Sequence, residues 1–94
     1  MKKILVLNGP NLNLLGAREP EVYGNTSYTE LVASLTSLGT ELGLDVDVRQ
    51  SNSEGQLIDW LHEGFSARIP VVINPAAFTH YSIAIHDAAE MVKS

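Results

Sequence analysis

Two side chains that could perform acid–base chemistry, Arg18 and Tyr23, lie five residues apart in the first quarter of the chain. A tyrosine ordinarily has a pKa of about 10, and a neighbouring guanidinium favours its phenolate. The phenolate could then remove a proton as a general base at neutral pH. The pair therefore predicts a site for proton abstraction, if the fold brings both side chains into one cleft.

Three further side chains could bind or orient a substrate: Asn11, Asn74 and His80. The two amides could orient substrate hydroxyls or a water molecule, and the imidazole could donate to a hydroxyl or a carboxylate. Each also has a simpler interpretation. An asparagine after a strand commonly caps a turn, and a single histidine is more often a hydrogen-bonding residue at a helix start than a catalyst. Their convergence on one predicted cleft is what favours a functional role.

Arg18 and Tyr23 belong to a segment that follows the apolar run Ile4–Leu7, which is typical of a buried strand. The segment cannot form a regular helix, because it is interrupted by Gly16, Pro20 and Gly24. It nevertheless contains four apolar side chains, Leu12, Leu14, Leu15 and Val22. A long loop with its own apolar anchors is typical of a binding loop or lid.

The rest of the chain predicts an alternation of helices and strands. Ser27 with Glu30 and Ser53 with Gln56 have the capping-box spacing that begins a helix. The predicted elements are a helix from Ser27 to Gly43, an edge strand Asp45–Gln50, a helix after Ser53, a central strand Ile69–Ile73 buried on both faces, and a helix from about Ser82. Three sets of residues should face inward: Leu31, Val32, Leu35, Leu38 and Leu42; Leu57, Ile58, Leu61 and Phe65; and Ile85, Ala88, Ala89 and Val92. Gly39 should soften the last turn of its helix, and Gly64 should close or soften its helix.

This order predicts an α/β domain with a parallel sheet and helices on both faces. Right-handed crossovers favour the strand order 2-1-3. In that order the chain leaves the first and third strands in opposite directions, and ligands of open α/β sheets bind at such a switch point. The loops expected there are Asn8–Asn11 and Asn74–His80. Residues 1–94 are predicted to form a single domain that is incomplete at its C-terminus, because the third strand would have an uncovered edge.

Composition excludes several functional classes. The net charge of −5 includes no basic patch for a phosphate backbone, so nucleic acid is not an expected partner. The chain has no cysteine, no stretch long enough to span a membrane and no signal peptide, which indicates a cytoplasmic protein. His80 and His86 lack the spacing of a helical metal pair, and no metal site is expected. Neither a serine nucleophile elbow nor a glycine-rich phosphate loop occurs.

The segment Asn8–Gly24, read as N-G-P-N-L-N-L-L-G-A-R-E-P-E-V-Y-G, closely resembles the signature of type II 3-dehydroquinases, the 3-dehydroquinate dehydratases of the shikimate pathway. Two later segments, Arg49–His62 and Ile73–His80, resemble the family's next two blocks, so the resemblance covers essentially all 94 residues. It implies a flavodoxin-like fold, with strand order 2-1-3-4-5 in the family, and a homododecamer built as four trimers. It also implies dehydration of 3-dehydroquinate to 3-dehydroshikimate, without cofactor or metal, by anti elimination through an enolate.

The resemblance also implies a role for individual residues. The family's general base corresponds to Tyr23, its transition-state-stabilising arginine to Arg18, and the asparagine that holds a water against the developing enolate to Asn11. Its substrate-binding positions correspond to Asn74, His80 and Asp87. In the family, the residue that corresponds to Asp87 reaches the site of a neighbouring subunit.

One part of the family pattern is missing from these residues. The family continues with a fourth strand, E-V-H-I-S-N, whose histidine protonates the leaving hydroxyl, and with a further substrate-binding arginine. His62, His80 and His86 align with other positions. We therefore expect a dehydroquinase that lacks its C-terminal third, with little or no turnover by the 94 residues alone.

Two alternatives remain open from the sequence. A flavodoxin-like nucleotide or flavin binder would share the topology, but it should carry a Ser/Thr/Gly-rich phosphate loop after the first strand. A partner-dependent fragment that acts only as an interaction module would fit the short chain and the uncovered third strand. A flavin absorbance spectrum tests the first alternative, and a defined hetero-complex without dehydratase activity would support the second.

Overall fold

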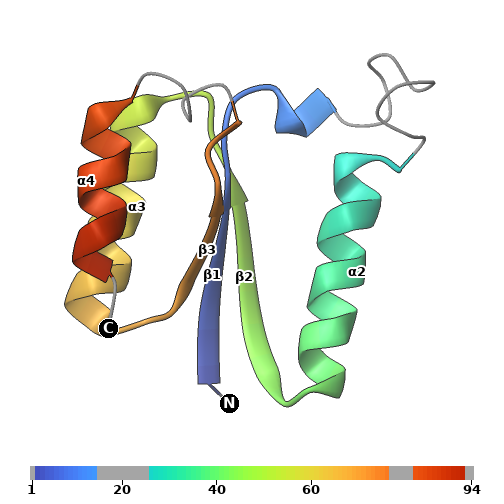
Figure 1. Ribbon diagram of the computed structural model, residues 1–94. Helices are drawn as coiled ribbons and strands as arrows, with labels where there is room; N and C mark the ends of the chain where they lie inside the picture. Colours follow the sequence, from blue (N-terminus) through green and yellow to red (C-terminus); the bar gives the residue numbers. More distant parts are fainter. Residues whose placement is uncertain (1, 15–25, 77–81, 93–94) are drawn as a thin grey trace.

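A computed structural model describes residues 2–14, 26–76 and 82–92 of the chain (Figure 1). The strands in these ranges are β1 (Lys2–Asn8), β2 (Leu44–Gln50) and β3 (Val71–Asn74). The helices are the short 3₁₀ helix η1 (Leu12–Leu14) and the α-helices α2 (Tyr28–Glu41), α3 (Glu54–Ala67) and α4 (Ile83–Val92). None of the helices in the described ranges is long and apolar enough to cross a membrane.

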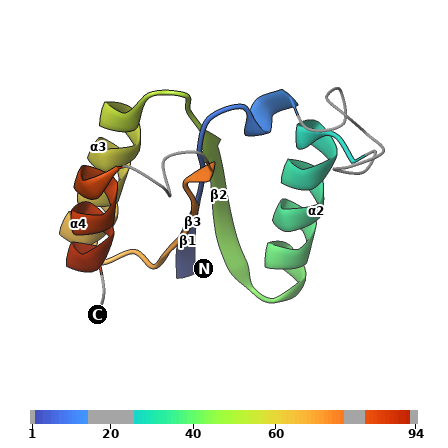
Figure 2. The ribbon, with the colours of Figure 1, turned by 45° about the horizontal axis from the view of Figure 1, so that its top comes forward.

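The described strands form one parallel sheet in the order β2-β1-β3. Figures 1 and 2 show α2 on one face of this sheet and α3 with α4 on the other. The α/β class, the parallel sheet, the strand order and the helices on both faces are therefore confirmed. In this order the central strand β1 pairs with a neighbour on each side, and all three strands run in the same direction.

Each α-helix begins at a serine whose hydroxyl accepts a hydrogen bond from a backbone N–H three residues later. Ser27 accepts from Glu30 at 3.1 Å, Ser53 from Gln56 at 3.2 Å, and Ser82 from Ile85 at 3.1 Å. Such N-caps satisfy backbone donors that have no partner within the helix. The helix starts predicted at Ser27, Ser53 and Ser82 are confirmed.

Two glycines inside helices lie where the helix meets a strand. Gly39 and Gly64 are both buried, and each helix continues past its glycine. A Cβ atom on Gly64 would lie 2.7 Å from Cγ2 of Val71, and one on Gly39 would clash with Val46. The glycines therefore allow a helix to approach a strand closely, and the softness predicted for the helix ends stays a prediction.

The buried apolar core of the described residues lies between the sheet and the α3–α4 layer. It consists of Leu5, Leu7, Leu57, Leu61, Ile85 and Ala88. The apolar stripe of α2 is less covered than its helical spacing predicted, since Leu38 is 51% and Leu42 65% exposed. The inward prediction for these two leucines was wrong, because only the part of α2 that packs over β2 is covered.

Strand β3 lies at the edge of the described sheet, where the strand order 2-1-3 places it, but its side chains are not buried on both faces as predicted. Val72 is 60% exposed, because it shares a face with Val6 on the side where α2 packs over β2 and not over β3. Phe65, predicted to face inward, is 50% exposed near the end of α3. An apolar run shows that a strand can be buried, but it does not show which neighbours cover it.

Candidate functional site

The described strands end together at one edge of the sheet. Asn8 at the end of β1 is paired with Gln50 on β2 and with Asn74 on β3. The three loops that follow these residues therefore start side by side, as the upper end of Figure 1 shows. This is the edge at which open parallel α/β sheets bind ligands.

The loops after β1 and β3 are in direct backbone contact. The N–H of Gly9 donates to the C=O of Asn74 at 2.8 Å. A Cβ atom on Gly9 would lie 2.5 Å from the carbonyl oxygen of Pro75, so only glycine fits between the two loops. This contact fixes the polypeptide that leads to Asn11 against the polypeptide that follows Asn74.

The loop after β2, to which the sequence analysis assigned no site residue, contacts the β1 loop. The N–H of Ser51 donates to the C=O of Asn8 at 3.0 Å, and the N–H of Asn11 donates to Oδ1 of Asn52 at 2.9 Å. Nε2 of Gln50 donates to the C=O of Gly9 at 3.2 Å and to Oδ1 of Asn52 at 3.0 Å. A cluster of side-chain amides and hydroxyls directly after a strand was the signal that could have found this loop.

Two asparagines of the site use their side chains to satisfy the backbone. Asn8 is 6% exposed, and its Nδ2 donates to the C=O of Arg49 at 3.4 Å. Oδ1 of Asn74 accepts from the N–H of Ala76 at 3.1 Å, which is an Asx turn. The simpler interpretation of an asparagine after a strand therefore holds for both residues. The Asx turn uses only Oδ1 of Asn74, and Nδ2 of Asn74 has no partner among the described residues.

Asn11 has an unusual backbone conformation. Its φ of 69° places it in the left-handed region, which is uncommon for any residue other than glycine and in which asparagine is enriched. Its side chain is exposed at the sheet edge. The structure therefore brings Asn11 and Asn74 to the same edge, as predicted.

Of the remaining predicted site residues, the structure describes only Asp87. Arg18, Tyr23 and His80 lie outside the described residues, so their predicted roles stay predictions. Asp87 lies on α4 and is exposed. Among the described residues, no three histidine, aspartate or glutamate side chains gather where they could hold a metal ion.

A group of charged side chains lies beside the site, where β2 meets α3. The Arg49 guanidinium bonds Asp47 at 2.8 Å and both carboxylate oxygens of Glu63 at 2.8 and 3.0 Å. Lys3 lies 3.7 Å from Asp47, and the Arg49 guanidinium lies 5.5 Å from the centre of the Trp60 ring. Hydrogen bonding to Arg49 lowers the pKa of Asp47 and of Glu63, and bonding to Glu63 and Asp47 raises the pKa of Arg49.

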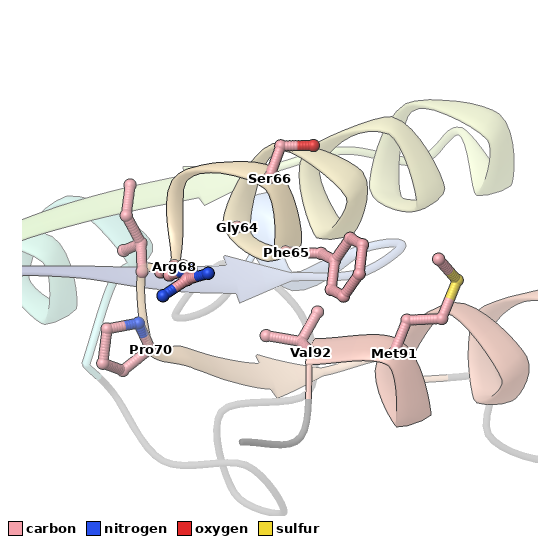
Figure 3. A pocket seen from close by; sticks show the side chains of 8 residues that line it. Gly64, Phe65, Ser66, Arg68, Pro70, Met91 and Val92 are labelled. Atoms are coloured by element: carbon pink, nitrogen blue, oxygen red, sulfur yellow. The ribbon is translucent and has the colours of Figure 1, made fainter.

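A hollow of about 540 Å³ lies at the opposite end of the sheet, away from the strand ends. Figure 3 shows it between the last turn of α3 and the end of α4, with Phe65, Arg68 and Met91 on its walls. No described side chain of the predicted site lines this hollow. Of the predicted site residues that the structure describes, Asn11 and Asn74 lie at the strand ends and not at this hollow.

Comparison with known proteins gives a match over nearly the whole chain. The family model described as "Dehydroquinase class II" matches residues 2–94. A 3-dehydroquinate dehydratase from Caldicellulosiruptor bescii is 50% identical over 93 residues, which are 98% of this chain and 64% of that protein. One from Rhizobium johnstonii is 52% identical over 89 residues, which are 95% of this chain and 61% of that protein.

Solved structures give the same result for the fold. A type II dehydroquinase from Propionibacterium acnes superposes with a TM-score of 0.94 at 55% identity, and the match covers 98% of this chain and 63% of that one. A 3-dehydroquinate dehydratase-like protein from Bifidobacterium longum superposes with a TM-score of 0.77 at 40% identity, again over 98% and 63% of the two chains. The 94 residues thus span less than two thirds of the length of these relatives.

Proposed function

This chain belongs to the class II dehydroquinase family, and we propose that the protein dehydrates 3-dehydroquinate to 3-dehydroshikimate. The observation that carries the proposal is the 50% identity to a 3-dehydroquinate dehydratase over 98% of the chain. The site geometry supports it, since Asn11 and Asn74 lie on loops that meet at the ligand-binding edge of the sheet.

In the proposed reaction, the phenolate of Tyr23 removes a proton from the carbon beside the substrate ketone. The electron pair of that C–H bond moves to the ketone oxygen, which forms an enolate. Asn11 holds a water that donates to the enolate oxygen, and Arg18 stabilises the negative charge that builds up during proton transfer. Asn74, His80 and Asp87 bind the substrate.

The second half of the reaction expels the hydroxyl group. The negative charge on the enolate oxygen re-forms the ketone, and the electron pair of the enolate double bond moves to form the new carbon–carbon double bond as the carbon–oxygen bond breaks. A general acid protonates the hydroxyl so that it leaves as water. The resemblance assigns this acid to a histidine on a further strand that these 94 residues do not contain. We therefore propose that this chain supplies the base and the enolate-stabilising groups, and that turnover requires sequence corresponding to the unmatched third of the relatives.

The decisive experiment is a dehydratase assay that follows the enone absorbance of 3-dehydroshikimate, on protein whose intact mass has been measured. Replacing Tyr23→Phe removes the phenol oxygen and should lower kcat by about 100-fold or more. Tyr28→Phe is the matched control, since Tyr28 begins α2 and should tolerate the same change. Equal activity of Tyr23→Phe and the native protein would overturn the assignment of the base.

The assay should also compare two lengths of chain. A polypeptide of 94 residues with a mass of 10.2 kDa should show little turnover, whereas protein with a continuation like that of the relatives should be active. Full activity at 10.2 kDa would show that the acid is supplied from within the chain.

Four further expectations stay predictions: the cytoplasmic location, the single domain, the absence of cofactor and metal, and the homododecamer of four trimers. Light scattering tests the dodecamer.

A further inference from the structure

Side-chain hydrogen bonds continue the connection between β1 and β2 beyond the end of the sheet. The last backbone bond of this pair runs from the N–H of Ser51 to the C=O of Asn8 at 3.0 Å. Three residues after Asn8, the N–H of Asn11 donates to Oδ1 of Asn52 at 2.9 Å. The side-chain carboxamide of Asn52 therefore links the β2 loop to the β1 loop beyond the last backbone bond of the ladder.

Asn52 accepts a second hydrogen bond, and its chain neighbours are also held in place. Nε2 of Gln50 donates to Oδ1 of Asn52 at 3.0 Å and also to the C=O of Gly9 at 3.2 Å. The N–H of Ser53 donates to the hydroxyl of Ser51 at 2.9 Å, and that hydroxyl donates to Oε1 of Gln56 at 2.7 Å. Since Ser51 is only 6% exposed, these bonds tie the β2 loop to the first turn of α3.

Asn11, whose N–H donates to Asn52, has an unfavourable backbone conformation. Asn11 has a φ of 69°, and the left-handed region is less stable than the right-handed one for residues with a Cβ atom. A non-glycine residue stays there only when its surroundings compensate for the cost. The hydrogen bond from the Asn11 N–H to Asn52 is a contact that can offset this cost, because it is formed by the backbone of Asn11 itself.

We propose that Asn52, held by Gln50, is a positioning residue that keeps Asn11 in its left-handed conformation and so fixes the direction in which the Asn11 side chain leaves the backbone. The proposal rests on the proposed function for one point only, namely that Asn11 then holds a water against the enolate. Asn52 is not assigned any contact with the substrate.

The positioning itself is tested without activity, by hydrogen exchange of the Asn11 amide followed by NMR. Asn52→Ala removes the acceptor and should lower the protection of this amide by about tenfold, the equivalent of one typical hydrogen bond. Asn52→Asp keeps a carboxylate oxygen as acceptor and should retain most of the protection. Asn13→Ala is the matched control, since Asn13 is an exposed asparagine in η1 with no side-chain bond among the described residues.

The effect of this positioning on catalysis is tested by steady-state kinetics on the active, full-length protein. Asn52→Ala should lower kcat by about tenfold while KM changes by less than about twofold, because the lost geometry matters in the transition state. Asn52→Asp should have a higher kcat than Asn52→Ala, and Asn13→Ala should match the native protein. If Asn52 had only a structural role, Asn52→Ala would lower the thermal stability without lowering kcat at an almost unchanged KM.

Two results would overturn the inference: unchanged protection of the Asn11 amide in Asn52→Ala, or kcat values for the Ala and Asp variants that both match the native enzyme. A native full-length protein without dehydratase activity would instead refute the proposed function. In that case the amide exchange still decides whether Asn52 positions Asn11, so the two failures are distinguishable.

Discussion

At the scale of single residues, the site depends on the absence of one side chain. Gly9 brings the β1 loop into contact with the β3 loop, with its N–H bonded to Asn74 and its Cα facing Pro75. The atoms in the way of any side chain belong to the backbone, which cannot move aside as a flexible side chain could. The spacing of the two loops that carry Asn11 and Asn74 is therefore set by Gly9.

Gly9→Ala should destabilise the protein by about 1–3 kcal/mol, the usual cost of overpacking, because its Cβ would lie 2.5 Å from the Pro75 oxygen. Urea unfolding followed by the fluorescence of Trp60, the single tryptophan, measures this cost. Gly55→Ala is the control. Its Cβ would meet only the Ser53 hydroxyl at 3.9 Å, and alanine in the first turn of α3 should leave stability unchanged or raise it. An equal loss in both variants would contradict the role of the close contact.

At the scale of elements, charged side chains join an edge strand to a helix. Asp47 and Arg49 project from β2 on the face of Leu5 and Leu7, their partners on β1, and Arg49 reaches Glu63 on α3. The opposite face of β2 carries Val46, which contacts Gly39 of α2. The alternation predicted for this strand thus separates an apolar side under α2 from an ionic side next to α3.

Arg49→Gln should lower the Tm by about 2–4 °C at pH 7, since partly exposed ion pairs contribute little each. The pKa values of Asp47 and Glu63 are lowered in the folded protein, so the stability from these carboxylates is present above their unfolded pKa and is lost as the pH falls through the folded values. The difference between native protein and variant should therefore shrink from pH 7 to roughly pH 3.

Thermal unfolding at a series of pH values checks this dependence. Arg68→Gln is the matched control, because Arg68 is an exposed arginine after α3 with no ion pair among the described residues, and its effect should be the same at every pH. A deficit of Arg49→Gln that persists at roughly pH 3 would assign its contribution to packing against Trp60 instead of to charge.

At the scale of the whole molecule, the two helical layers are unequal. The buried apolar cluster of the described residues is made by β1, α3 and α4, whereas the only buried residue of α2 is Gly39. Burial of apolar area is the main favourable term in folding. The layer formed by α3 and α4 should therefore be the stable part of the domain, and α2 should open more readily.

Leu57→Ala should destabilise the protein by about 2–5 kcal/mol, because Leu57 is fully buried and its loss leaves a cavity. Leu38→Ala, the same change at a side chain that is 51% exposed on α2, should cost less than about 1 kcal/mol. Urea unfolding of the two variants makes the comparison. Equal costs would mean that the α2 face is covered in solution, by a second copy of the chain or by residues outside the described ranges.

The sequence by itself determined the class of this protein and the location of its candidate site. Serine caps and apolar periodicity are local signals, and they predicted where α2, α3 and α4 begin and that three parallel strands alternate with them. The segment Asn8–Gly24 carried the family resemblance, and the match over residues 2–94 confirms it. The candidate residues Asn11 and Asn74 follow from these signals, since both lie in loops expected after a predicted strand.

Tertiary structure decided what depends on neighbours that are distant in the sequence. The exposure of Val72, Leu38 and Leu42 depends on which element covers each face, and periodicity does not contain that information. The close contact of Gly9 with Pro75 joins residues 66 positions apart, and the bond from Asn11 to Asn52 joins residues 41 apart. The positioning of Asn11 by Asn52 could therefore be recognised only once the strand ends were placed side by side.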